Sequence, residues 1–544
     1  MGKVLIIGAG VSGLSAAISL AERGIKSVII SPFPSERTQS VMAAGGINAI
    51  NTKVGDSTKQ HVEDTFSGGC DIAGREAIEG LCSCAPEIVR QLECIGMVFT
   101  RDEEGELARR VFGGQTYNRT CYGGSSTGKY MVSAMVMKCR QYEAAGLIER
   151  LLWTDFHSCL IKDGKAYGAL IFNEATRELV PMYADAVIMA TGGQNAMFGK
   201  TTGSTTCDGY AAGRLFMQGV SLKNLEFIQY HPTTIETYHK RMLVSEAARG
   251  EGGRLFYEKD GKRVYFMEDK FGPNGNLMPR DIVSKSMYEL GEQVFLDVSF
   301  LGRKLIDERL AEVRIICEKY RGIDITKEPI PVEPSIHFFM GGIAVKNNHE
   351  TNIKGLYAVG ECASIYHGAN RLGGNSLLAA FYGGQVAARS IAESYSPDGN
   401  GAADFSHFAS EETEKLRKAG ETKSKFPVMY IRDMLAEDMN KYLGIARTEK
   451  ELVKGRETLD FYLDAASKLN YDRNVLPYFN YSLQGILVLA KAVLVSAISR
   501  KETRGAHFRT DYPERDDNYA AASIISFNDG AYELYYDFEK KFEK

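Results

Sequence analysis

Three glycines near the start of the chain have the spacing of a loop that binds pyrophosphate. They are Gly8, Gly10 and Gly13, in the pattern G-x-G-x-x-G. The first glycine permits a tight turn, the second lets the backbone approach the phosphates, and the third lets a helix pack against the preceding strand. The first amides and the positive dipole of that helix favour phosphate charge. The motif therefore predicts that the chain binds a nucleotide.

A second loop, over residues 37–48, is rich in small residues and contains Gly45 and Gly46. Small side chains and a glycine pair let the backbone lie flat against a large planar ligand, and a tight loop without a ligand is the alternative. The strand before this loop ends in Ser31, where an acidic residue that binds the adenosine ribose is usual, and Glu36 is a weak substitute. These residues alone leave the choice between NAD and FAD open.

Short apolar runs must position these loops. Residues 3–7 and 27–30 are expected to be buried parallel strands, joined by a helix over 14–23. Two further strand-like runs, 186–190 and 355–359, also end in glycines. Ligands bind where the strands of a doubly wound sheet end in loops at a shared edge. We therefore expect an α/β protein whose Rossmann-like sheet is built from separate parts of the chain.

The positions of these runs divide the chain into three expected domains. A nucleotide-binding domain would comprise residues 1–221 and 349–410. The stretch between them, 222–348, would be an inserted second domain. From about residue 411 the chain becomes charged and has helical periodicity, so residues 411–544 are expected to form a helical C-terminal domain.

The composition argues against several classes of protein. A net charge of −4 offers no basic surface for nucleic acid. The most apolar stretch, 486–498, is short for a bilayer span and contains Lys491, so we expect a buried helix. The ten cysteines lack iron–sulfur, zinc or haem spacing, even at the closest pair, Cys82 and Cys84. Reduced thiols and no direct membrane span indicate a cytoplasmic protein without a bound metal.

Several longer motifs occur in the order of one known family over most of the chain. Together with the loop 37–48, they resemble the succinate dehydrogenase and fumarate reductase flavoproteins. The last of them resembles the family's S-R-x-x-S-R-G-A-H. The motifs are H-P-T at 231–233, S-E-A-A-R-G-E-G-G at 245–253, P-R-D-I-V-S at 279–284, H-F-F-M-G-G-I at 337–343, H-G-A-N-R-L-G-G-N-S-L at 367–377 and S-R-K-E-T-R-G-A-H at 499–507.

The resemblance implies FAD as the cofactor, held in a Rossmann-like FAD-binding domain with an inserted α+β capping domain. In such a protein the flavin carries the redox chemistry and the fold orients it. The residues implied to bind FAD are Gly8, Gly10 and Gly13 at the pyrophosphate, Ser40, Ala44, Gly45 and Gly46 near the ring, Glu361 at the ribityl–ribose region, Ser376 and Leu377 over the flavin edge, and Ser31, Thr191, Gly192 and Asn375 as further contacts.

The resemblance also implies a four-carbon dicarboxylate, fumarate or succinate, as the substrate. One carboxylate would be bound by His231 and Ser245, and the other by His337 and Arg371. Arginine suits this role because its planar fork meets a carboxylate at two points. The family usually has Thr where this chain has Ser245, so the hydroxyl donor is kept while a methyl contact is lost.

Reduction of fumarate needs a hydride from flavin N5 and a proton on the opposite carbon. By resemblance Arg280 is the proton donor, relayed through Glu246 and Arg249. An arginine acid is unexpected, because its ordinary pKa lies above about 12. Clustered arginines and burial could lower that barrier. The alternative is that Glu246 and Arg249 only form a buried ion pair.

One departure from the family concerns how the flavin is held. Relatives in respiratory complexes have R-S-H-T, in which the histidine bonds covalently to the flavin, but this chain has Arg37-Thr38-Gln39-Ser40. An amide cannot form that bond, so FAD should be bound non-covalently. The covalent bond raises the flavin potential that succinate oxidation requires. Gln39 therefore favours fumarate reduction as the working direction.

A second departure concerns the source of electrons. The chain has no haem motif and no iron–sulfur spacing, so another protein must reduce the flavin. An iron–sulfur partner subunit is the expected donor, because most of the family works in this way. Membrane association would then come through that partner.

Two alternatives come from different classes. L-aspartate oxidase shares the fold, but those enzymes carry a glutamate before a glycine pair, where this chain has Phe112. A buried phenylalanine cannot pair with the substrate ammonium, so aspartate is disfavoured. A non-catalytic FAD-binding electron-transfer subunit would need none of Arg280, His231, His337 and Arg371, which are all present.

Overall fold

The computed structural model describes residues 2–238, 240–394, 403–419, 427–468 and 477–538. Its nucleotide-binding part is built on a five-stranded parallel sheet in the order β19-β10-β1-β2-β6. The strands are β1 (Val4–Ile7), β2 (Ser27–Ser31), β6 (Ile148–Leu152), β10 (Ala186–Met189) and β19 (Leu356–Ala358). The four predicted strands are therefore confirmed, and they come from separate parts of the chain.

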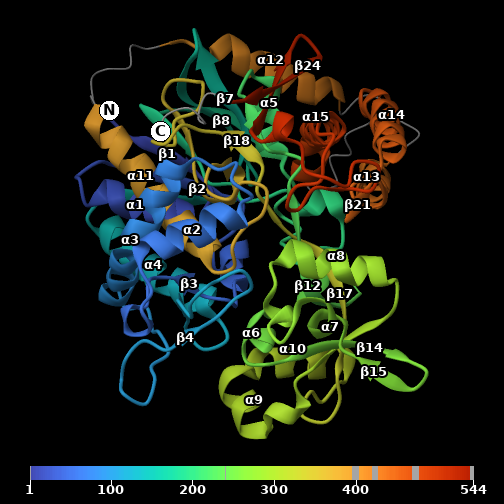
Figure 1. The fold of residues 1–544 in the computed structure, drawn as a ribbon. Coiled ribbons are helices and arrows are strands. Elements are labelled where there is room, and N and C mark those ends of the chain that lie inside the picture. Colours follow the sequence, from blue (N-terminus) through green and yellow to red (C-terminus); the bar gives the residue numbers. More distant parts are fainter. Residues whose placement is uncertain (1, 239, 395–402, 420–426, 469–476, 539–544) are drawn as a thin grey trace.

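Helices cover this sheet and set the loops at its edge (Figure 1). Helix α1 (Val11–Ala21) begins after Gly10, and all of its residues are buried. It packs on α11 (Asn375–Ser394), where the Ser15 hydroxyl donates to the Phe381 carbonyl at 2.7 Å. The other helices of this part are α2 (Thr58–Gly68), α3 (Arg75–Cys94), α4 (Thr127–Ala144) and α5 (Tyr210–Met217).

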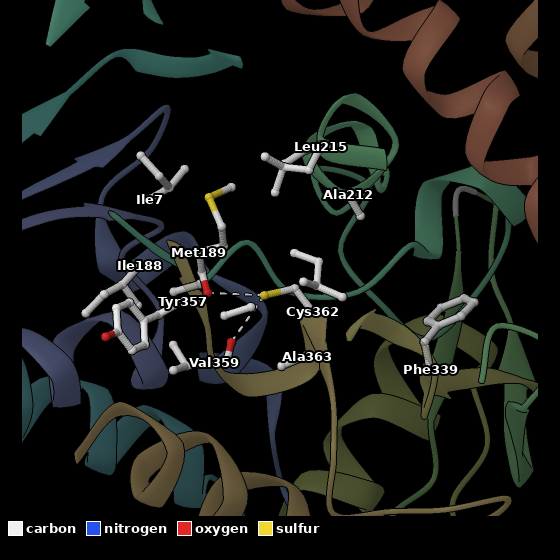
Figure 2. Close-up of a cluster of buried hydrophobic side chains, with 14 of the residues drawn as sticks. Ile7, Ile188, Met189, Ala212, Leu215, Phe339, Tyr357, Val359, Cys362 and Ala363 are labelled. Atoms are coloured by element: carbon white, nitrogen blue, oxygen red, sulfur yellow. Dashed lines mark hydrogen bonds between the residues drawn. The ribbon is translucent and has the colours of Figure 1, made fainter. Parts of the chain in front are cut away.

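An apolar core lies where strands β1, β10 and β19 end (Figure 2). Ile188 and Met189 of β10 lie near Tyr357 of β19, with Leu215 of α5 nearby. The Cys362 thiol donates to the carbonyls of Met189 and Val359, at 3.3 and 3.2 Å. This core anchors the loop that carries Glu361 to the carboxyl ends of the strands.

Two small antiparallel sheets complete the nucleotide-binding part. One has the order β7-β8-β9 and the other the order β3-β5-β4. Their strands are β7 (Thr154–Lys162), β8 (Lys165–Asn173), β9 (Glu178–Tyr183), β3 (Ile47–Asn48), β5 (Thr120–Cys121) and β4 (Arg109–Arg110). The β3 pairing holds the end of the small-residue loop, because Ile47 lies opposite Cys121.

The inserted segment forms a capping domain with its own sheet and core, at the foot of the view in Figure 1. The sheet has the order β13-β12-β17-β16-β14-β15, and β12 pairs with β17 although about a hundred positions separate them. Its elements are β12 (Ile228–Glu236), β13 (Arg241–Leu243), β14 (Arg254–Lys259), β15 (Lys262–Val264), β16 (Val294–Asp297), β17 (Ile330–Phe339), α6 (Ala247–Gly250), α7 (Phe266–Phe271), α8 (Arg280–Leu290), α9 (Arg303–Arg309) and α10 (Ala311–Arg321). The residue numbers at which the domains meet stay predictions.

The C-terminal domain is mainly helical, as expected. Its helices are α12 (Ser406–Ala419), α13 (Val428–Tyr442), α14 (Glu449–Ala466) and α15 (Pro477–Ser499). Within α15 the window Ser482–Ser499 is apolar and long enough to cross a membrane, with mean hydropathy 1.8, but 72% of it is buried inside the fold. This burial agrees with the expected core helix.

The last two described strands form a β-hairpin that the sequence analysis did not include. Strands β23 (Ala522–Asn528) and β24 (Ala531–Asp537) pair with each other, and β23 also pairs with β11 (Leu222–Lys223). The same sheet continues through β18 (Gly342–Ala344) to β20 (Ala363–Ser364). The hairpin therefore ties the end of the chain to both ends of the capping segment. A short parallel pair, β21 (Ala446–Arg447) and β22 (Phe508–Arg509), lies nearby.

Candidate active site

One cavity of about 290 Å³ lies between the carboxyl ends of the parallel strands and the capping domain. Every residue predicted to bind cofactor or substrate lines it, except Gly13, Asn375 and Arg249. Gly13 lies beneath the pyrophosphate loop, and Arg249 lies behind Glu246. Asn375 is fully buried and bonds to Asn48, His61 and Thr65 instead. The fold thus brings almost all of the predicted site together.

The end of the cavity predicted to bind the pyrophosphate has no room for side chains on its glycines. Gly8 has φ +113°, and a Cβ there would lie 2.3 Å from the Ala190 carbonyl oxygen. A Cβ on Gly13 would lie 2.1 Å from the Gly8 carbonyl oxygen, so the helix packs on the turn as predicted. At the start of α1 the Val11 N–H donates to Ser40 Oγ at 3.2 Å, and the positive end of the helix dipole lies beside the same loop. These residues fit the diphosphate of FAD.

The wall predicted to contact the flavin ring is flat for a similar reason. A Cβ on Gly45 would lie 3.1 Å from the Phe112 ring, and one on Gly46 would lie 2.5 Å from the Cys121 carbonyl oxygen. Gln39 lines the same wall, and its Oε1 is buried without a hydrogen-bond partner among the described residues. Opposite, Glu361 Oε1 accepts from the Phe339 N–H at 3.1 Å, and burial raises the pKa of this carboxyl to about 7.

A buried ion pair stands at the capping side of the cavity. Arg280 donates from Nε and Nη2 to Glu246 Oε2, at 2.8 and 2.6 Å. Glu246 Oε1 accepts from the Gly113 N–H at 2.7 Å and lies 3.4 Å from Arg249 Nη2. Burial opposes ionisation of Glu246, but Arg280 and Arg249 outweigh it and lower its pKa to about 2. The predicted relay residues are therefore in contact, in the order Arg280, Glu246, Arg249.

Gln229 is a site residue that the sequence analysis missed. Its Oε1 accepts from Arg280 Nη1 at 3.1 Å and from Arg371 Nη2 at 3.0 Å. Its Nε2 donates to Asn370 Oδ1 and to the Arg371 carbonyl, at 2.7 and 2.8 Å. One amide thus holds two guanidinium groups together. Its position two residues before His231, on the same face of a strand, was the available signal.

The two histidines lie on paired strands of the capping sheet. His231 is on β12 and His337 on β17, and their ring centroids are 5.2 Å apart. Burial and the nearby Arg280 lower both pKa values well below the usual range, so both rings are neutral near pH 7. Thr202 Oγ1 lies 2.7 Å from His337 Nδ1, and Thr233 contacts His231 Nδ1. These contacts leave each Nε2 for a ligand in the cavity.

Arg371 faces the same space and is not fully satisfied. Its guanidinium carbon lies 4.3 Å from the centre of the Phe338 ring, and its Nε is buried without a partner among the described residues. Burial, followed by the charge of Arg280, lowers its pKa well below the usual range. An anion would relieve both effects, because it pairs the charge and accepts from the orphaned donor.

The fold and the cavity define a flavin-dependent oxidoreductase with a capping domain. Residues 3–377 match the FAD binding domain family, and residues 432–541 match the fumarate reductase flavoprotein C-terminal family. The chain belongs to the succinate dehydrogenase/fumarate reductase flavoprotein family, and the resemblance noted from the motifs is confirmed.

Relatives of both names are similar over nearly the whole chain. The succinate dehydrogenase flavoprotein subunit of Bacillus subtilis is 37% identical over 95% of this chain and 92% of its own. The fumarate reductase flavoprotein subunit of Haemophilus influenzae is 33% identical over 97% of this chain and 92% of its own. A structure of E. coli quinol fumarate reductase superposes with a TM-score of 0.91 at 31% identity, covering 99% of this chain and 97% of that one.

Proposed function

We propose that this protein reduces fumarate to succinate with FAD. The proposal is supported above all by the shared contact of Arg280 and Arg371 with Gln229, beside the two neutral histidines. Two cations and several neutral donors on one side of a flavin-sized cavity fit a small dianion. Flavin binding alone requires none of these side chains. Phe112, which is fully buried at the wall, offers no charge to an ammonium group, so aspartate fits less well.

The substrate would lie between the flavin wall and the capping domain. His231 and Ser245 would donate to one carboxylate, and His337 and Arg371 to the other. A neutral imidazole donates from one ring nitrogen only, so each histidine would donate from Nε2 when its Nδ1 accepts from Thr202 or Thr233. Arg371 would supply the charge. Two fixed carboxylates leave the central double bond one orientation against the flavin wall. Closure of the capping domain would exclude water and strengthen each contact.

FAD supplies, when bound, the electron pair that leaves as a hydride. The proton for the other carbon would come from the Arg280 guanidinium, which lines the cavity. Glu246 is ionised beside it, with a pKa of about 2 and an oxygen 2.6 Å from Arg280 Nη2, so it would return a proton to Arg280 only as it receives one from Arg249. Arg249 lies on the far side of Glu246 and would pass a proton inward. One hydride and one proton added to fumarate give succinate.

The direction and the flavin attachment rest on Gln39. This side chain lines the flavin wall, and an amide forms no covalent bond to the flavin. We therefore propose non-covalent FAD and fumarate reduction as the working direction. Acid precipitation should release FAD into the supernatant and leave no fluorescent band on a denaturing gel.

A second protein would reduce the flavin. The relatives are named as subunits, which supports a partner, and we propose an iron–sulfur subunit in this role. Through that partner a cytoplasmic chain would reach a membrane. The function itself can be tested without the partner, in an anaerobic assay driven by a reduced viologen dye. Fumarate-dependent dye oxidation with succinate as product supports the proposal, and dye oxidation only with other enoates contradicts it.

A further inference from the structure

A buried ionic network joins the C-terminal domain to Glu226, just before strand β12. Arg500 donates to Glu226 Oε1 at 2.6 Å and to Glu502 Oε1 at 2.8 Å. Arg504 donates to the two oxygens of Glu502, at 2.7 and 2.9 Å. All four side chains are buried, and none lines the cavity. The reaction proposed above leaves this network without a role.

One end of the network holds the residues just before β12. Glu226 stands three residues before Gln229 and five before His231. Its carboxylate is bound by Arg500, and its carbonyl accepts from Arg447 Nη1 at 2.7 Å. The guanidinium of Arg500 also covers the Phe227 ring, 4.8 Å from its centre. The residues that lead into the strand of Gln229 and His231 are therefore held by Arg500 and Arg447.

The other end holds the loop that carries Arg371. The Ala506 N–H donates to the Ala369 carbonyl at 3.0 Å, and Ala369 itself donates to Gly69 at 2.8 Å. Gly505, with φ +52°, packs so closely that a Cβ there would lie 2.7 Å from the Ala369 carbonyl oxygen. Arg504 Nη1 reaches the Cys70 carbonyl at 3.3 Å, on the far side of the same loop. Ala369 is thus held between two segments, two residues before Arg371.

We propose that this network, Glu226–Arg500–Glu502–Arg504 with Gly505 and Ala506, is a positioning device for the substrate site. It ties the strand of His231 and Gln229 to the loop of Arg371, and so sets the separation of the two carboxylate-binding groups. Paired buried charges resist displacement, because a broken pair leaves an uncompensated charge. The inference rests on the proposed function for the identity of the ligand.

A matched pair of glycine substitutions separates this role from general stability. Gly505→Ala places a Cβ against Ala369, whereas Gly530→Ala, at φ +87° in the β23–β24 turn, meets nothing within 4 Å. Both positions carry the strain of a positive φ. We expect Gly505→Ala to raise the KM for fumarate and the Kd for malonate, a non-reacting dicarboxylate, by about tenfold. FAD content, flavin spectrum and kcat should stay near wild type, and Gly530→Ala should match wild type throughout.

Equal malonate affinity in Gly505→Ala and Gly530→Ala would overturn the positioning role. If Gly505→Ala does not fold with FAD, Arg504→Lys decides, because it keeps the charge on Glu502 but loses the reach to Cys70. We expect it to weaken malonate binding by about threefold, and unchanged binding contradicts the proposal. Failure of wild-type protein to bind malonate at all would instead count against the proposed function.

Discussion

The two ends of the cavity differ in the groups that they offer to an anion. At the end proposed to bind the nucleotide, Gly8, Gly10 and Gly13 leave no room for side chains, so backbone amides can approach phosphates without a charged side chain. At the end proposed to bind the dicarboxylate, called the dicarboxylate end below, Arg280 and Arg371 are buried cations held by Glu246 and Gln229. The first end is formed by neighbours in sequence, whereas the second gathers residues from distant segments. Each end should therefore fail in its own way when it is altered.

The difference also separates binding from chemistry. A cradle of backbone amides offers fixed partial charges to an anion without a buried ionised side chain. Buried cations are costly unless paired, and Arg371 Nε has no partner among the described residues, so an anion bound beside it would lower this cost. We expect damage at the first end to show in FAD content, and damage at the second to show in turnover with FAD retained.

The largest effect should come from Arg280→Ala at the dicarboxylate end. Removal of the proton donor should lower kcat about 10³-fold, while FAD content stays unchanged. Dye-coupled kinetics and the ratio of flavin to protein absorbance measure both quantities. Arg303→Ala, at an exposed arginine on α9 of the same domain, is the control and should be neutral. Near-normal turnover of Arg280→Ala would remove the proton role.

Gly13→Ala should damage only the nucleotide end. Its Cβ would lie 2.1 Å from the Gly8 carbonyl oxygen, so the turn must move and FAD affinity should fall about a hundredfold. Titration of the FAD-free protein by flavin fluorescence measures the Kd. Gly74→Ala, whose Cβ meets only the Asn347 oxygen at 4.0 Å, is the matched control. At saturating FAD, turnover should recover. A loss of kcat that persists at saturating FAD would contradict the expectation that this end affects only FAD binding.

Gln229→Leu should have a smaller effect at the dicarboxylate end. The two guanidinium groups would lose their shared acceptor and repel each other. We expect the KM for fumarate to rise about tenfold with FAD fully bound. Gln293→Leu, at an exposed glutamine of the same domain, should leave KM unchanged. Equal KM values in the two variants would mean that Gln229 does not align the arginines.

The smallest effect concerns Glu361, between the two ends. Burial raises its pKa to about 7 in the folded FAD-free protein, above its ordinary value. The folded state then binds the proton more tightly, so this stabilising contribution is present at low pH and lost as pH rises through about 7. Glu361→Gln removes the titration. In thermal melts, the melting temperature of the variant should rise relative to that of wild type between about pH 5 and pH 8. A constant difference between the two melting temperatures would contradict this.

Much of the nucleotide end could be predicted because its determinants are local. The strand over 186–190 was recognisable from one apolar run and the glycines after it, and β10 occupies Ala186–Met189. The glycine spacing predicted the close packing that Gly8 and Gly13 show. Such patterns survive without tertiary context because neighbouring residues produce them.

The dicarboxylate end was predictable only through resemblance to a family. Without the surrounding motif, nothing about the residue type distinguishes Arg371 or His337 from an ordinary surface or structural residue. Gln229 was not predicted because its role depends on the pairing of β12 with β17 and on the loop of Arg371. The β23–β24 hairpin was not predicted for a similar reason, since β23 pairs with β11 near residue 222. Contacts between distant segments follow from the assembled fold and not from local spacing.

The most direct measurement is anaerobic mixing of the dye-reduced protein with fumarate, and separately with iminoaspartate. Flavin absorbance near about 450 nm follows reoxidation, because the oxidised cofactor absorbs there. We expect rapid reoxidation by fumarate alone, with one succinate formed per flavin. No reoxidation by fumarate, or faster reoxidation by iminoaspartate, would contradict the assignment of the buried arginine pair to a dicarboxylate.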